Sequence, residues 1–197
     1  MKKYFGLFLI VFLMASGFGC SSKYMKPASI ESISALKPGA GESIIIFMRP
    51  SAFGGAIQSS VFDVTTSENV LAGIVSSKTK VAHRTSPGEH LFMVVGESAD
   101  FMKANLDGGK TYYALVTPRM GVWKARFSLK PVHLYEISSS DFKGWDSSCD
   151  LYENTEASYQ WAKDNGPSIQ SKREEYFQKW MSKSDEDRPV LNREDGI

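Results

Sequence analysis

Short runs of β-branched and aromatic residues recur along the middle of this chain, and residues that favour turns separate them. The runs cover residues 42–49, 57–64, 70–75, 80–83, 90–95, 101–106, 111–117, 122–130 and 132–137. Many short runs at this spacing are typical of an all-β domain. We therefore expect residues 42–137 to form a mainly β domain, an antiparallel sandwich or barrel.

The clearest alternation lies at residues 123–130. The alternating sets are Trp123, Ala125, Phe127 and Leu129 on the one hand and Lys124, Arg126, Ser128 and Lys130 on the other. Successive side chains of a strand point to opposite faces, so the first set is expected in the core and the second in water. Turns are expected at residues 87–88 and 107–109, where glycine permits a positive φ.

The composition changes after Ile137. Residues 138–150 are polar and predict a loop, and Asn154 or Thr155 is expected to cap a helix that ends before Gly166. A second helix is predicted over about residues 168–182. Its apolar face is formed by Ile169, Tyr176, Phe177, Trp180 and Met181. Residues 138–183 thus form a loop and two-helix extension, and the charged residues 184–197 are expected to be loosely held. We expect the apolar face to pack on its own domain, and docking to a partner is the alternative.

The first twenty residues have the layout of an export signal. A basic tip at residues 1–3 precedes an apolar run over residues 4–15, and small residues then lead to Cys20. The run is too short to span a membrane. This N-terminus resembles bacterial lipoprotein precursors, in which the cysteine receives lipid and becomes the first residue. The resemblance implies a signal at residues 1–19 and lipid on Cys20, while a plain secretory signal and a retained anchor are alternatives.

Cleavage before Cys20 leaves 197 − 19 = 178 residues, enough for one domain. The net charge changes from +1 to +1 − 2 = −1, so no nucleic acid partner is expected. Residues 20–41 predict a tether between lipid and domain. Cys149 then has no intramolecular partner, and we expect an inert thiol, with a mixed disulfide as the alternative. Ser21 resembles the outer-membrane signal of enteric-type lipoproteins, which implies the periplasmic side of an outer membrane.

Three segments resemble a family of small bacterial lipoproteins and exported domains, domain of unknown function 2846. They are Ile46-Phe47-Met48-Arg49-Pro50 with Gly54-Gly55, Ser86-Pro87-Gly88-Glu89-His90, and Gly109-Lys110-Thr111-Tyr112-Tyr113. The resemblance covers about residues 40–130 and implies that the domain is a compact antiparallel β-sandwich of the immunoglobulin-like or PEGA-like kind at an exported location, without an assigned activity. The Pro-Gly-Glu-His turn is also found in PEGA modules. Each segment has a simple fold-making interpretation beside ligand contact.

No catalytic, metal or cofactor signature is present. His83, His90 and His133 fall on different predicted strands, and none has another His or Cys at metal-ligand spacing. Nucleophile elbows and phosphate loops are missing from the sequence. An unrecognised site near His83 and His90, with Asp63 or Glu89 nearby, is the alternative.

Eight residues are candidates for binding. They are Arg49, His90, Tyr112 and Tyr113 in the segments above, and the basic stripe Arg119, Lys124, Arg126 and Lys130. The stripe is either the wet side of a sheet or a contact for a phosphate-rich surface such as lipid headgroups or lipopolysaccharide. The whole pattern predicts a non-catalytic, lipid-anchored envelope protein that binds an envelope protein or polymer. A small-ligand carrier that uses the sandwich interior, or an enzyme, is the alternative.

Overall fold

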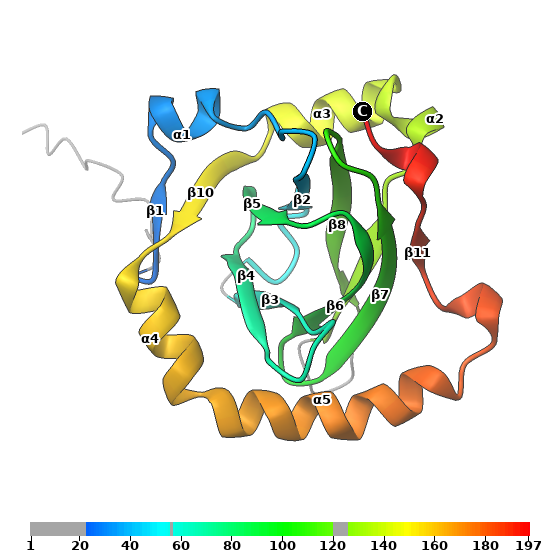
Figure 1. Ribbon diagram of the computed structural model, residues 1–197. Coiled ribbons are helices and arrows are strands. Elements are labelled where there is room, and N and C mark those ends of the chain that lie inside the picture. The colour runs from blue at the N-terminus through cyan, green and yellow to red at the C-terminus, as the bar shows by residue number, and fades with distance from the viewer. Residues whose placement is uncertain (1–22, 56, 120–125) are drawn as a thin grey trace, which may run out of the picture.

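The computed structural model describes residues 23–55, 57–119 and 126–197. Two β-sheets occupy the centre of the molecule, with helices along two opposite sides (Figure 1). The prediction of a mainly β fold is confirmed. Cys20 and Lys124 lie outside the described residues, as do the signal at residues 1–19 and the first part of the alternating segment.

The first sheet has the strand order β1-β10-β5-β2-β8-β9. Its strands are β1 (Met25–Pro27), β10 (Asp150–Asn154), β5 (Thr79–Thr85), β2 (Ser43–Arg49), β8 (Thr111–Arg119) and β9 (Arg126–Pro131). Strand β2 pairs antiparallel with β5 but parallel with β8, and β10 pairs parallel with β5. The prediction of purely antiparallel pairing is therefore wrong. Between β2 and β8 the chain builds strands of the second sheet, so these neighbours are not joined by a hairpin.

The second sheet has the order β11-β7-β6-β3-β4. Its strands are β11 (Val190–Leu191), β7 (Ala99–Leu106), β6 (Gly88–Val95), β3 (Ser59–Asp63) and β4 (Val70–Val75). Strands β3, β4, β6 and β7 pair antiparallel, whereas β11 runs parallel to β7. Eight of the nine predicted runs thus contain a strand.

The two sheets share one core of tightly packed side chains. Phe47, Phe62, Phe92 and Phe101 are all 0% exposed, and the rings of Phe47 and Phe92 meet edge to face at 5.2 Å. The sheets also approach closely where β4 runs beside β5. A Cβ on Gly73 would lie 2.8 Å from the side chain of Val81, so a larger residue here would separate the two strands.

Strand β9 confirms the predicted faces for the part of the alternating segment that the structure describes. Phe127 and Leu129 are buried in the core, whereas Arg126 and Lys130 are exposed. Strand β2 is instead buried along its whole length, because both of its faces are covered.

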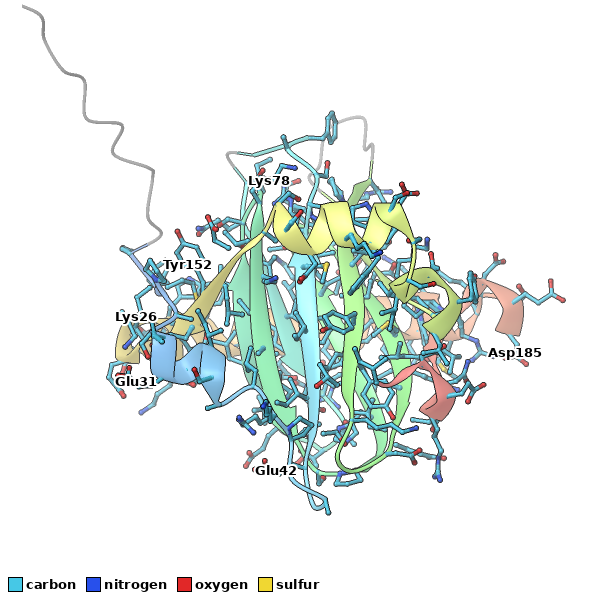
Figure 2. All side chains as sticks on the ribbon, turned by 90° about the horizontal axis from the view of Figure 1, so that it is seen from above. Lys26, Glu31, Glu42, Lys78, Tyr152 and Asp185 are labelled. Carbon is cyan, nitrogen blue, oxygen red and sulfur yellow. The ribbon has the colours of Figure 1, made fainter. Side chains whose placement is uncertain are left out.

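The predicted strand at residues 132–137 and the predicted loop at residues 138–150 are both wrong. Residues Leu134–Ile137 form helix α2, and Ser140–Ser147 form helix α3, which the side chain of Ser139 caps through the backbone N–H of Phe142. Phe142 packs edge to face on Tyr113 at 4.9 Å. These helices cover the outer face of the first sheet (Figure 2). The apolar side chains of β2 that point to this face form a second buried cluster, which includes Phe142.

The two-helix extension is present. Thr155 caps α4 (Glu156–Asp164), and α5 (Gly166–Met181) follows directly. Helix α5 packs against β7 and β6, with Trp180 only 1% exposed. Phe101 contacts Phe177 and Trp180 at centroid distances of 5.4 and 5.9 Å. The helix therefore packs on its own domain, although Met181 is 43% exposed and does not belong to the buried face.

Arg173 fixes the middle of α5 to the turn between β3 and β4. Its guanidinium donates to the carbonyls of Val64 and Thr66, each at 2.7 Å, and to the side chain of Asn69 at 3.1 Å. One arginine thus satisfies several carbonyls of a turn that forms no ladder of its own.

The expected tether and the expected loose tail both contain ordered structure. Strand β1 pairs with β10, and Ser29 caps the short helix α1 (Ile30–Ser34). In the tail, β11 joins β7 between two 3-10 turns, Asp185–Asp187 and Arg193–Asp195, and Asp195 is 3% exposed. The sequence pattern does not predict order in these polar segments, because their order comes from pairing with distant strands and not from local apolar periodicity.

The neighbouring residues Trp180 and Met181 test the orientation of α5. Trp180→Ala should lower the free energy of unfolding by about 3–5 kcal/mol, because it empties a buried site. Met181→Ala should cost less than about 1 kcal/mol, because its side chain is largely in water. Urea denaturation measures both. Equal losses would contradict the packing of α5 described above.

Candidate functional site

Asp63, His83 and His90 form a buried polar cluster between the two sheets. Asp63 ends β3, His83 lies in β5 and His90 in β6. The Asp63 carboxylate lies 2.8 Å from Nδ1 of His90 and 3.7 Å from Nε2 of His83. Thr65 also donates to Asp63 through its backbone N–H and its hydroxyl. The structure thus brings together the residues of the alternative site predicted from the sequence.

The surroundings hold Asp63 and His90 in their charged forms. Burial raises the pKa of Asp63, but the nearby His83 and the hydrogen bonds from His90 and Thr65 outweigh burial and hold this pKa far below its usual range. Burial lowers the pKa of His90, but Asp63 and the Ser86 carbonyl outweigh it, so the pKa is raised.

The second ring nitrogen of His90, Nε2, lies 2.9 Å from the Ser86 carbonyl oxygen. Both nitrogens therefore face acceptors, and a charged imidazolium that donates from both satisfies them. Such a ring has no free lone pair to take a proton or to bind a metal. The cluster therefore acts as a structural ion pair that joins β3, β5 and β6.

Two other candidate binding residues are also enclosed by the fold. Arg49 is 0% exposed and donates to the carbonyls of Phe53, Gly54 and Ile57 at 2.6–2.8 Å, with its guanidinium 4.8 Å above the ring of Phe127. Arg49 thus shapes the loop that follows β2. It has no access to a ligand at the surface.

Tyr112 and Tyr113 point to opposite faces of the first sheet. Tyr112 is 0% exposed and accepts from the backbone N–H of Asp107 at 2.8 Å. Tyr113 lies on the outer face beneath Phe142, and burial raises its pKa. Tyr112 therefore supports the hairpin at residues 107–110, whereas Tyr113 borders a groove on the outer face.

The groove on the outer face of the first sheet has a volume of about 810 Å³. Cys149 lies at its edge, is 4% exposed, and has a pKa raised chiefly by burial, as the inert-thiol interpretation expects. The ammonium of Lys80 bonds to the carboxylate of Asp146, and so one wall of the groove is neutralised.

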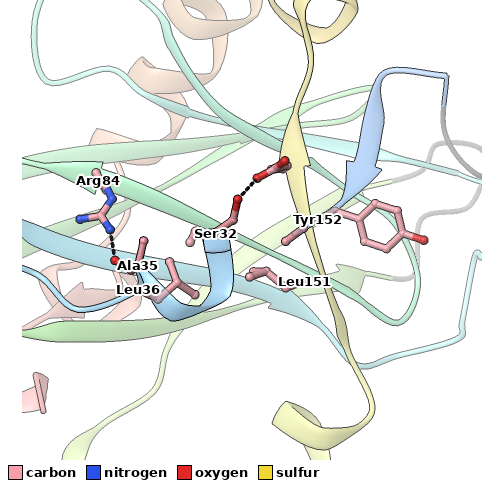
Figure 3. A pocket seen from close by; sticks show the side chains of 9 residues that line it. Ser32, Ala35, Leu36, Arg84, Leu151 and Tyr152 are labelled. Carbon is pink, nitrogen blue, oxygen red and sulfur yellow. Dashed lines mark hydrogen bonds between the residues drawn. The ribbon is translucent and has the colours of Figure 1, made fainter. Parts of the chain in front are cut away.

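A second, smaller cavity of about 280 Å³ lies where α1 crosses β5 and β10 (Figure 3). Ser32 donates to Glu153 at 2.7 Å, and Arg84 donates to the carbonyl of Ala35. These bonds fasten α1 to the sheet. Their donors are occupied by protein acceptors, so this cavity has little free polarity to offer a ligand.

The predicted basic stripe does not form one continuous surface in the structure. Lys130 pairs with Glu136 at 3.2 Å and faces Trp145. Arg119 and Arg126 are opposite each other in the β8–β9 pair, and both line a cleft of about 250 Å³ with residues of α5. Lys179 and Lys183 also line this cleft, although the sequence gives no reason to choose them as binding residues.

Asp100 of β7 holds part of this cationic cleft in place. Its carboxylate, in a residue that is 5% exposed, accepts from Lys183 at 3.0 Å and from Ser128 at 2.7 Å, and lies 3.4 Å from Arg119. Lys179 pairs with Glu175 one turn earlier in α5. In the sequence, the only sign of the lysines in the cationic cleft is the four-residue spacing of Lys179 and Lys183. A solvated helix face has the same pattern, so this spacing does not identify a site.

Two residues that line the cleft have a buried polar group without a hydrogen-bond partner among the described residues. These groups are the hydroxyl of Ser98, a residue 4% exposed, and the indole N–H of Trp180, a residue 1% exposed. Buried polar groups are nearly always paired in folded proteins. The cationic cleft therefore combines positive charge with unused hydrogen-bond capacity.

No protein-family model matches the chain, and no curated protein matches it. Within residues 23–55, 57–119 and 126–197, no helix is both long enough and apolar enough to cross a membrane. Among the same residues, no three His, Cys, Asp or Glu side chains are grouped so that they could hold a metal ion.

The histidine–aspartate cluster predicts a pH dependence of stability. Because the pKa of His90 is raised, its contribution is fully present below the unfolded value of about 6.5 and is lost as the pH rises through the folded pKa. Because the pKa of Asp63 is lowered, its contribution is present above about pH 4 and is lost on acidification. The cluster is thus most stabilising between about pH 4 and pH 6.5.

His90→Gln should therefore destabilise the protein more near pH 6 than near pH 9, as measured by urea denaturation at both values. Glu89→Gln, a change at the preceding residue, is the matched control. A His90→Gln penalty that is the same at both pH values would contradict the charged pair.

Proposed function

We propose that this protein is a non-catalytic, lipid-anchored binding module of the cell envelope, held by lipid on Cys20 at the periplasmic side of an outer membrane. Its two sheets are proposed to form a sandwich related to the exported domains of domain of unknown function 2846, and that resemblance stays a prediction. The basic tip, the apolar run and the small residues before Cys20 support the anchor.

The observation that carries this proposal is the position of β1. The first strand among the described residues begins five residues after Cys20, where Met25 pairs with Asn154 of β10. At about 3.5 Å per extended residue, five residues span at most about 17 Å. A lipid on Cys20 therefore keeps the domain against the bilayer surface instead of on a long tether.

The surface beside β1 suits that position. The ring of Tyr24 packs on Trp161 of α4 at 5.9 Å, and the ammonium of Lys23 lies 4.7 Å above Tyr24. Tyr159 of the same helix is 51% exposed. Tyrosine, tryptophan and lysine are the side chains that favour a membrane–water interface.

The site geometry favours binding over the alternative functions. The ring nitrogens of His90 are both engaged, and burial of Cys149 disfavours its thiolate. Fully buried phenylalanines pack between the sheets, which argues against a carrier that holds its ligand there. The cavities described above instead open on the outside of the sheets, where a partner reaches them.

Palmitate labelling in cells tests the anchor. Cys20→Ala should abolish labelling and release the protein from the membrane fraction, because only the lipid holds it there. Cys149→Ala is the matched control and should stay labelled and membrane-bound. A Cys20→Ala protein that is still labelled would overturn the proposal of a lipid anchor on this residue.

A further inference from the structure

The cationic cleft carries more positive charge than its own carboxylates neutralise. Arg119, Arg126, Lys179 and Lys183 contribute four positive charges, and Asp100 and Glu175, their partners among the described residues, contribute two negative ones, which leaves 4 − 2 = +2. The guanidinium of Arg126 has no ion-pair or hydrogen-bond partner in the part of the chain that the structure describes. Like charges this close repel each other, and an anion in the cleft would relieve that repulsion.

The cleft is preorganised by groups that the core holds. Arg119 and Lys183 are positioned by the buried carboxylate of Asp100, and Arg126 lies opposite Arg119 in the β8–β9 ladder. The cations thus come from β8, from β9, and from α5 and the residues just after it; β8 pairs with β9, and both β9 and α5 pack on β7. Fixed donors lose less entropy on binding than mobile surface lysines do.

The unpaired buried donors indicate which kind of anion fits. Ser98 and Trp180 line the cleft, and among the described residues their buried hydroxyl and indole N–H have no acceptor. A phosphate group has several acceptor oxygens and can bind guanidinium, ammonium and neutral donors at once. The volume of about 250 Å³ suits a single phosphate or pyrophosphate group and not an acyl chain.

We propose that the cationic cleft is a binding site for a phosphate group of an envelope ligand. Arg126 and Lys179 provide charge that the ligand can use, and Arg119 and Lys183 are held beside them by Asp100. Two sources have this chemistry: a phosphate on a soluble or polymeric envelope compound, and the headgroup of an anionic phospholipid. The inference rests on the proposed binding role but not on lipid at Cys20, so failure of either leaves the other testable.

Calorimetric titration of the whole chain tests the site. The protein is held in micelles of an uncharged detergent, and the probes are inorganic pyrophosphate in one arm and phosphatidylglycerol added to the micelles in the other. The double variant Arg126→Gln/Lys179→Gln removes two exposed charges of the cleft. Lys143→Gln/Lys163→Gln is the matched control, because it removes two exposed charges from α3 and α4, away from the cleft. Thermal melts verify that every variant is folded.

We expect the double variant to raise the Kd of the bound probe by at least about tenfold, whereas the control stays within about twofold of the parent chain. Binding of pyrophosphate with this pattern supports a soluble or polymeric phosphate as the source. Binding of phosphatidylglycerol alone, with the same pattern, supports a lipid headgroup. If neither probe binds, or if both double variants weaken binding equally, the cleft is not a phosphate site.

Discussion

Burial of strand β2 on both faces is the constraint on which the rest of this structure depends. Ile45 and Phe47 face the second sheet, while Ile44, Ile46 and Met48 face outward and are also buried. A sheet with two apolar faces needs two covers. The second sheet supplies one cover, and α1, α2 and α3 with their connections supply the other (Figure 2). This explains why the N-terminal segment around α1 and the polar segment that forms α2 and α3 fold back on the first sheet.

Buried charges connect the elements that apolar packing brings together. Arg49 satisfies carbonyls of the loop after β2, Arg173 satisfies those of the turn after β3, and Asp63 joins His83 and His90 across the sheets. Loss of one partner from such a group leaves a buried charge or carbonyl without compensation, which is costly. The groups that look most reactive in the sequence are therefore committed to the fold. Residues at the edges of the sheets are the ones that remain available to bind a ligand at the surface.

The cationic cleft shows how such an edge acquires a site. Strands β8 and β9 bring Arg119 and Arg126 together, and α5 adds lysines only because Trp180 fixes its last turns against β7. The apolar contact that holds the helix on the domain thus also sets the spacing of the cations. Trp180 therefore links the stability of the domain to the arrangement of the cleft. The carboxylate of Asp100 holds Arg119 and Lys183 near each other.

The sequence by itself determined the strand-rich class, most strand positions, the two C-terminal helices and the apolar face of the second one, because these depend on local periodicity and caps. It also placed Asp63 near His83 and His90 as one alternative. The tertiary structure alone decided the parallel pairing of β2 with β8, the order of residues 23–41 and 184–197, and the helices at residues 134–147. It alone brought Lys179 and Lys183 to Arg126. The physical reason is that strand pairing and charge clustering depend on contacts between residues far apart in the chain, which local pattern does not record.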